Sequence, residues 1–289
     1  MKTFVFTSKI TADQFHTNRF EIEDIDYDFN ASSGTFQIRP NTDSFFNGDS
    51  DAYFILKPFE DIPIYEIQYR VMQFELAQLL QTFREDTLME GKMDMDLKLV
   101  LKGNNWDEIE KNLEGTLILS GENLIFNGLD LDVVIERFKR SQRFTLADVG
   151  AVVLMGPAGI LVTKGSDFAS LVVLNSGERS EVRQLTSIWT AKKGHINLDD
   201  VAFATNKNRM AAKGWIDLTK DSLDIQIALI NKKGCSIFAQ TLKGSLQDPE
   251  SGKLKVMRSL FAPVSNLLNT IGGEECQVFY NGAVKPPEK

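Results

Sequence analysis

Residues 92–102 show the strictest alternation of apolar and polar residues in the chain, and a period of two residues is the signature of a β-strand. One side of this strand carries only apolar residues, while the other is charged except at Val100. A strand of this kind has to cover its apolar side with other parts of the protein or with a ligand. The pattern therefore predicts a sheet with two chemically distinct faces.

The same alternation recurs in other segments. Leu117 and Leu119 begin another strand, which we expect to end in a turn at 121–123, and residues 210–218 and 223–229 form a hairpin around 221–222. We predict that the apolar residues of these strands form one continuous lining: Met93, Met95, Leu97, Leu99, Leu101, Leu117, Leu119, Leu223, Ile225, Ile227 and Leu229.

This lining has two interpretations. It is either the core of an ordinary sheet covered by helices, which the alternation alone favours, or the inner wall of a trough that binds lipid tails. The methionines at 93 and 95 favour an adaptable surface, because their side chains are flexible and polarisable. Sequence pattern alone leaves both interpretations open.

Helical patterns interrupt the strands. Residues 76–83 carry an apolar stripe, and Asn105 with Glu108 predicts the capped start of a short helix. Residues 129–189 are expected to form a helical insert that ends in a short helix over 180–188, and a last helix is expected over 254–271.

The predicted fold is therefore α+β: a mainly antiparallel, elongated, curved and groove-like sheet with amphipathic helices at one end. Residues 1–60 form a partial β-rich segment, and residues 61–289 form the main domain, which contains the insert.

Residues 149–163, inside the insert, carry no charged side chain. The run contains Pro157 and is shorter than the roughly 20 apolar residues that cross a bilayer. It is either a helix buried in the protein or one that contacts a membrane or a partner protein. In the second case the contacting side chains are Val152, Val153, Leu154, Met155, Ile160 and Leu161.

Composition and motifs argue against several functions. Forty acidic and 32 basic residues give a net charge of -8, which disfavours nucleic acid as a partner. The two histidines, His16 and His195, lie far apart and near no cysteine cluster, so we expect no metal site, no cofactor and no catalytic residue. The two cysteines, Cys235 and Cys276, either form one disulfide or remain buried thiols, and their number does not decide between these states.

Four stretches carry a resemblance to a known family: QFELAQLLQTF, GNNWDEIEKNLEGTLILSGENLIFNGLDLDVVIERFKRSQ, DVGAVVLMGPAGILVTKGSDFASL and CQVFYNGAVKPP. From about residue 64 to its end, the chain resembles the C-terminal region of the AsmA-like family of bacterial envelope proteins. Members of that family are typically anchored in the inner membrane, have a long β-rich body in the periplasm, and are related to bridge-like lipid-transfer proteins.

The resemblance implies a non-enzymatic protein of outer-membrane biogenesis that binds phospholipid acyl chains in its groove. It implies a periplasmic location, with an inner-membrane anchor that this sequence does not include, and pairing of Cys235 with Cys276 in that oxidising compartment. The alternative is a docking module, in which the insert contacts the outer membrane or an assembly protein and the sheet carries no lipid.

Overall fold

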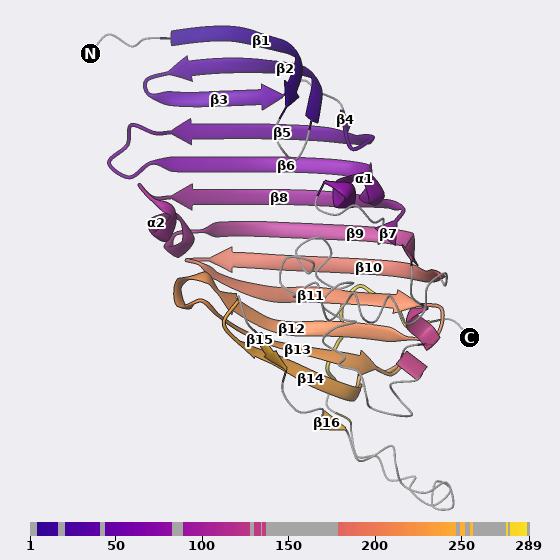
Figure 1. The fold of residues 1–289 in the computed structure, drawn as a ribbon. Coiled ribbons are helices and arrows are strands. Elements are labelled where there is room, and N and C mark those ends of the chain that lie inside the picture. The colour runs from indigo at the N-terminus through magenta and orange to yellow at the C-terminus, as the bar shows by residue number, and fades with distance from the viewer. Residues whose placement is uncertain are drawn as a thin grey trace, which may run out of the picture.

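The computed structural model describes residues 5–16, 21–40, 44–82, 89–127, 130–133, 135–136, 179–246, 249–251, 255–256, 276 and 278–287. Its described strands form one 16-stranded sheet in which every neighbouring pair is antiparallel. The order follows the chain, β1-β2-β3-β5-β6-β8-β9-β10-β11-β12-β13-β14-β15, so that each main strand lies beside its neighbour in sequence. Figure 1 shows these strands stacked from β1 at the top towards β14 near the bottom, in a sheet that twists along its length.

The main strands of the first half are β1 (Val5–His16), β2 (Glu21–Ser32), β3 (Thr35–Pro40), β5 (Gly48–Lys57), β6 (Ile64–Glu75), β8 (Lys92–Lys102) and β9 (Glu114–Asn127). Those of the second half are β10 (Arg179–Lys192), β11 (His195–Thr205), β12 (Arg209–Asp217), β13 (Ser222–Ile230) and β14 (Ser236–Gly244). The short strands are β4 (Ser44–Phe45), β7 (Met89–Glu90), β15 (Pro249–Ser251) and β16 (Lys255–Val256).

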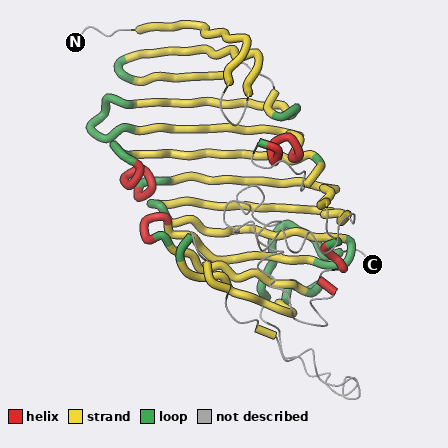
Figure 2. Tube along the Cα trace, in the orientation of Figure 1, coloured by secondary structure: helices red, strands yellow, loops and turns green. Residues whose placement is uncertain are grey.

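The described helices are short and lie at the ends of strands. α1 (Leu76–Gln81) follows β6, α2 (Trp106–Lys111) follows β8, and the 3-10 helix η1 (Leu218–Lys220) follows β12. The predicted cap of α2 is confirmed, because the backbone N–H of Glu108 donates to Oδ1 of Asn105 over 3.0 Å. α1 and α2 lie at opposite side edges of the sheet (Figures 1 and 2), so the prediction that the helices gather at one end is not confirmed, and the fold is mostly β.

The strand register separates the two faces of the sheet, because residues paired directly across antiparallel strands point to the same side. One row of such pairs runs through Ala52, Tyr69, Leu97, Leu117, Trp189, Leu198, Gly214, Ile225 and Leu242. We call the side that contains this row the apolar face, and the other side the opposite face.

The apolar face is not equally covered along the sheet. From β10 to β14 its side chains belong to a large buried cluster, in which Phe203 and Met210 are 0% exposed. Leu131 and Ile135, from the helical residues 131–133 and 135–136, are members of the same cluster. Between β3 and β9 most side chains of this face are only half-buried.

Three local predictions are wrong. Residues 180–188 lie in β10 and not in a helix. Residues 121–123 are not a turn but lie inside β9, at the point where this strand changes its partner from β8 to β7. Residues 255–256 are a strand paired with β14, so no helix begins there. The rest of the last predicted helix and residues 137–178 of the insert, with the run 149–163, lie outside the described residues.

Candidate functional site

The structure places the eleven residues of the predicted lining on the apolar face. Met95 pairs with Leu119 and Leu97 with Leu117, while the row continues from Leu117 through Trp189 to Ile225. The remaining members occupy the same side of β8, β9 and β13, two residues apart along each strand. The alternation in the sequence therefore located one face of the sheet across strands that are far apart in the chain.

Burial divides these eleven residues into two groups. Leu223, Ile225, Ile227 and Leu229 are 1–2% exposed, and Met93 and Leu119 are also buried. They are part of the protein's own core, so no ligand reaches them in this structure. The half-buried members are Met95, Leu97, Leu99, Leu101 and Leu117. Only this second group offers apolar surface to a ligand.

The half-buried part of the face extends beyond the predicted residues towards β1. Paired positions of β3, β5 and β6 add Ile38, Phe54 and Ile67, which continue directly into Leu99. Further along, the rings of Phe6, Phe29, Phe36 and Phe59 follow one another with centroid separations of 6.1, 5.7 and 5.9 Å. The high phenylalanine content of the chain was the available signal for these residues, but their strands alternate less strictly than 92–102.

This part of the face is uncharged. On β3, β5, β6, β8 and β9, the described residues of the apolar face that form cross-strand pairs are aliphatic, aromatic, methionine, glycine, proline or serine. Burial raises the pKa of the Tyr69 phenol to about 12, against a partial compensation by a hydrogen bond with Ser50. The Tyr69 side chain is half-buried and packs against the apolar cluster, a surrounding that suits hydrocarbon and disfavours ions.

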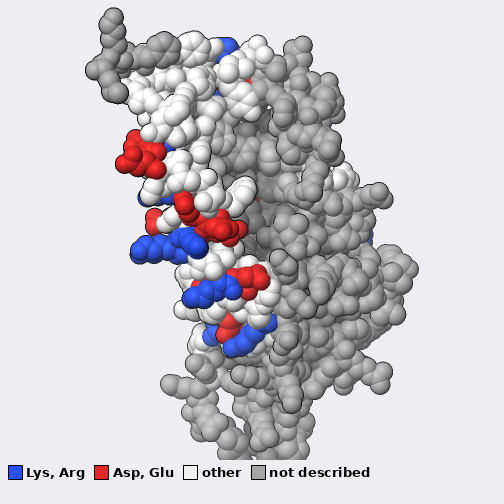
Figure 3. Space-filling view, turned by 60° about the vertical axis from the view of Figure 1, so that its left-hand side comes forward, with Lys and Arg blue, Asp and Glu red and all other residues white. Residues whose placement is uncertain are grey.

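The opposite face carries the charges of the same strands as cross-strand pairs. Lys57 lies 2.9 Å from Glu66 and Arg70 lies 2.9 Å from Asp96. Seen from the side edge formed by α2 and the neighbouring loops, basic and acidic side chains gather over the strand ends (Figure 3). Ion pairs of this kind stabilise the fold only slightly, but their charged groups remain hydrated. The opposite face is therefore suited to contact with water, unlike the apolar face.

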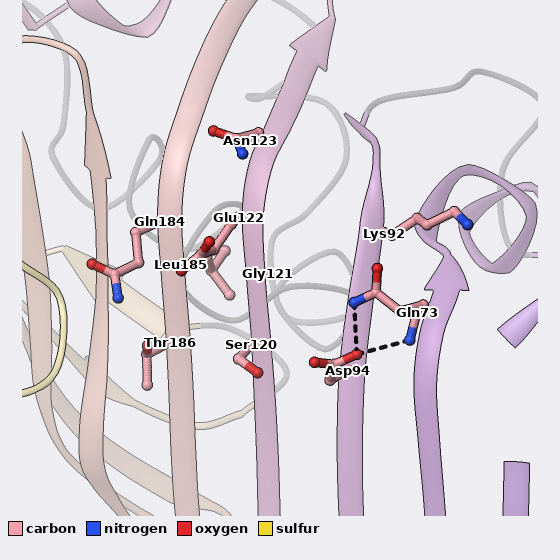
Figure 4. A pocket seen from close by; sticks show the side chains of 10 residues that line it. All are labelled: Gln73, Lys92, Asp94, Ser120, Gly121, Glu122, Asn123, Gln184, Leu185 and Thr186. Atoms are coloured by element: carbon pink, nitrogen blue, oxygen red, sulfur yellow. Dashed lines mark hydrogen bonds between the residues drawn. The ribbon is translucent and has the colours of Figure 1, made fainter. Parts of the chain in front are cut away.

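A polar cavity of about 390 Å³ lies at β8, β9 and β10, and it does not include any residue of the predicted lining. Gln73 donates to Oδ1 of Asp94 from both its backbone N–H and its side-chain amide, over 2.7 and 3.1 Å. Figure 4 shows these two residues on one side of the cavity and Gln184 and Thr186 on the other. Its lining suits water or a polar group rather than hydrocarbon: Gln73, Lys92, Asp94, Ser120, Gly121, Glu122, Asn123, Gln184, Leu185 and Thr186.

The C-terminal segment 278–287 covers part of the opposite face. It lies on small side chains, Ala202, Ala204, Ala211 and Ala228, which let its backbone come close to the strands. Val284 is 0% exposed in this contact.

Hydrogen bonds and a disulfide hold the segment in place. The hydroxyl of Tyr280 donates to Asp200 over 2.6 Å and accepts the N–H of Val284, while Arg209 donates to the carbonyl of Val284 over 2.9 Å. A disulfide joins Cys276 to Cys235, which lies between β13 and β14, and the Cα atoms of the two residues are 6.0 Å apart.

Comparison with known families decides the identity. Residues 7–149 match the model of the AsmA family. The chain belongs to the AsmA family. A search of the curated proteins and a search of the solved structures each give no significant match.

The AsmA match and the half-buried part of the apolar face occupy the same region. The matched residues contain β2–β9 and β1 from residue 7 onwards, whereas the four quoted stretches of the sequence lie from residue 73 onwards. Within the described part of this AsmA-family chain, no helix is long and apolar enough to cross a membrane. The described residues also contain no group of three or more histidine, cysteine or acidic side chains placed to hold a metal ion.

Proposed function

We propose that this AsmA-family chain is a non-enzymatic, periplasmic part of an envelope lipid carrier, and that its apolar face binds phospholipid acyl chains along β1–β9. The observation that carries the proposal is the uncharged and mostly half-buried surface over the described residues of β3–β9, which is backed by a charged opposite face. Family membership supports it, since AsmA-family proteins are associated with the bacterial envelope.

The energetics of such a carrier need no chemical step. Exposing an acyl chain to water costs roughly 0.8 kcal/mol for each methylene, or about 13 kcal/mol for 16 carbons. A leucine- and phenylalanine-lined surface replaces the bilayer interior as the surrounding of the chain and removes most of this cost. The protein then lowers the barrier to lipid movement by matching the apolarity of the membrane, and the polar headgroup stays in water.

A charge on the apolar face tests this proposal. Leu99 is half-buried on β8, and Leu99→Asp places a carboxylate where an acyl chain would remove its water, which costs several kcal/mol for an unpaired ion. We expect the variant to retain several-fold less phospholipid after purification, measured by mass spectrometry of organic extracts.

The matched control is Thr116→Asp, because Thr116 is a half-buried neutral residue on the opposite face whose partner is Lys98. It should retain as much lipid as the unmodified chain. If both variants have the circular dichroism spectrum of the unmodified chain and carry equal phospholipid, then the apolar face does not bind acyl chains.

A further inference from the structure

The accessible part of the apolar face ends abruptly at one strand. In the row that crosses the sheet, Tyr69, Leu97 and Leu117 on β6, β8 and β9 are half-buried. The next two residues of the row, Trp189 and Leu198, are 7% and 6% exposed, and Ile225 beyond them is 1% exposed. The change from open to closed surface therefore falls between β9 and β10.

Trp189 stands at this boundary as the largest side chain of the row. It pairs with half-buried Leu117 on one side and with buried Leu198 on the other. Its indole N–H donates to Oγ of Ser187 over 2.6 Å, and Ser187 lies on the same face of the same strand. Because its single polar group is satisfied within β10, the ring can remain in an apolar wall without a ligand or water.

The edge of the face next to α1 is also closed. Leu76 and Leu80 of α1 are 2% and 1% exposed and belong to the same buried cluster as Phe74. The ring of Phe45 lies 5.3 Å from that of Tyr69 and 6.4 Å from that of Phe74, which fills the corner between β4 and β6. At the other edge Phe59, whose ring lies 5.9 Å from that of Phe36, is 77% exposed.

We propose, on the basis of the function proposed above, that the acyl-chain site is a compartment closed at Trp189 and along α1, and open at the edge of Phe59. It is not a trough that runs through the whole sheet. The seven strands from β1 to β9 on the main path span roughly 29 Å at about 4.8 Å per step. A bilayer core about 30 Å thick holds two tails end to end, so the compartment suits the tails of one or two lipid molecules.

Photolabelling of the unmodified chain tests the boundary without a substitution that could unfold it. The probe is a phosphatidylcholine with a diazirine in its acyl chain, presented in vesicles of phosphatidylethanolamine and phosphatidylglycerol. After irradiation and proteolysis, mass spectrometry identifies the labelled residues. We expect label on the apolar side of 65–69, 95–101 and 117, and at least tenfold less on 76–81, 196–203 and 223–229.

The outcomes separate this inference from the proposed function. Comparable label on 223–229 or on α1 would overturn the closed compartment while leaving acyl-chain binding intact. Absence of label from the whole apolar face, with the chain folded, would overturn both. Label restricted to β1–β9 supports both.

Discussion

Removal of the disulfide should destabilise the half of the sheet that contains β10–β14. Cys235 and Cys276 are 41 residues apart in sequence, and a cross-link that closes a loop of this length lowers the entropy of the unfolded chain by about 13 cal/mol/K, or about 4 kcal/mol at 25 °C. Cys276 is exposed, whereas Cys235 is 2% exposed. The variant Cys276→Ser therefore removes the bond and leaves the packing around Cys235 in place.

The assay is equilibrium unfolding in urea, followed by the fluorescence of the three tryptophans, of which Trp189 and Trp215 lie on β10 and β12 and Trp106 lies on α2. We expect the Cys276→Ser variant to lose about 4 kcal/mol of unfolding free energy. Reduction of the unmodified chain with dithiothreitol should give the same loss, and reduction of the variant should change nothing. An unchanged urea midpoint in both the variant and the reduced chain would refute the argument that this cross-link limits the unfolded state.

Two further predictions concern polar groups. Tyr280→Phe should cost about 1–3 kcal/mol of unfolding free energy, because it removes the donor to Asp200 and leaves the buried N–H of Val284 without its acceptor. Tyr65→Phe is the control, and equal urea midpoints for the two variants would contradict this prediction. Hydrogen bonds from Thr219, followed by Lys220, lower the pKa of Asp217 to about 2, so its carboxylate stabilises the fold fully above the unfolded pKa near 4 and loses this effect as the pH falls towards 2. Asp217→Asn should therefore lower the urea midpoint at pH 5 and pH 7 but much less at pH 2.5, and an equal difference at all three pH values would exclude this cause.

The strands with two chemically distinct faces were predictable from the sequence. β8 has the predicted bounds, since apolar and charged residues alternate there with Val100 as the one exception, and the hairpin of β12 and β13 lies where the pattern indicated. The face that β13 presents was also correctly assigned. What the alternation could not show was which members of that face the protein itself covers, because burial depends on distant elements such as α1 and residues 131–136.

The errors have local causes. Val182, Leu185 and Ile188 are three residues apart, a spacing that imitates a helix. In β10 a shift in register between Val182 and Gln184 lets Val182 and Leu185 both join the buried cluster, whereas Ile188 pairs with Asp200 on the opposite face. Around Asn123, turn-forming residues mark a change of strand partner instead of a turn, and Asn123 has a positive φ of 54° inside β9. Such irregularities break the period of two that strand prediction uses.

The chain-order topology has a consequence for how proteins of this kind can change in length. Each main strand pairs with the strands before and after it, so adding or deleting one hairpin alters the reach of the sheet by about 10 Å and leaves all other pairings as they were. The C-terminal segment is the exception. Tyr280 and Val284 form hydrogen bonds with Asp200 of β11 and Arg209 of β12, although the segment follows these strands by many residues in the chain. Evolution can thus vary the number of hairpins before β10 freely, whereas the part braced by that returning segment has to be inherited as a unit.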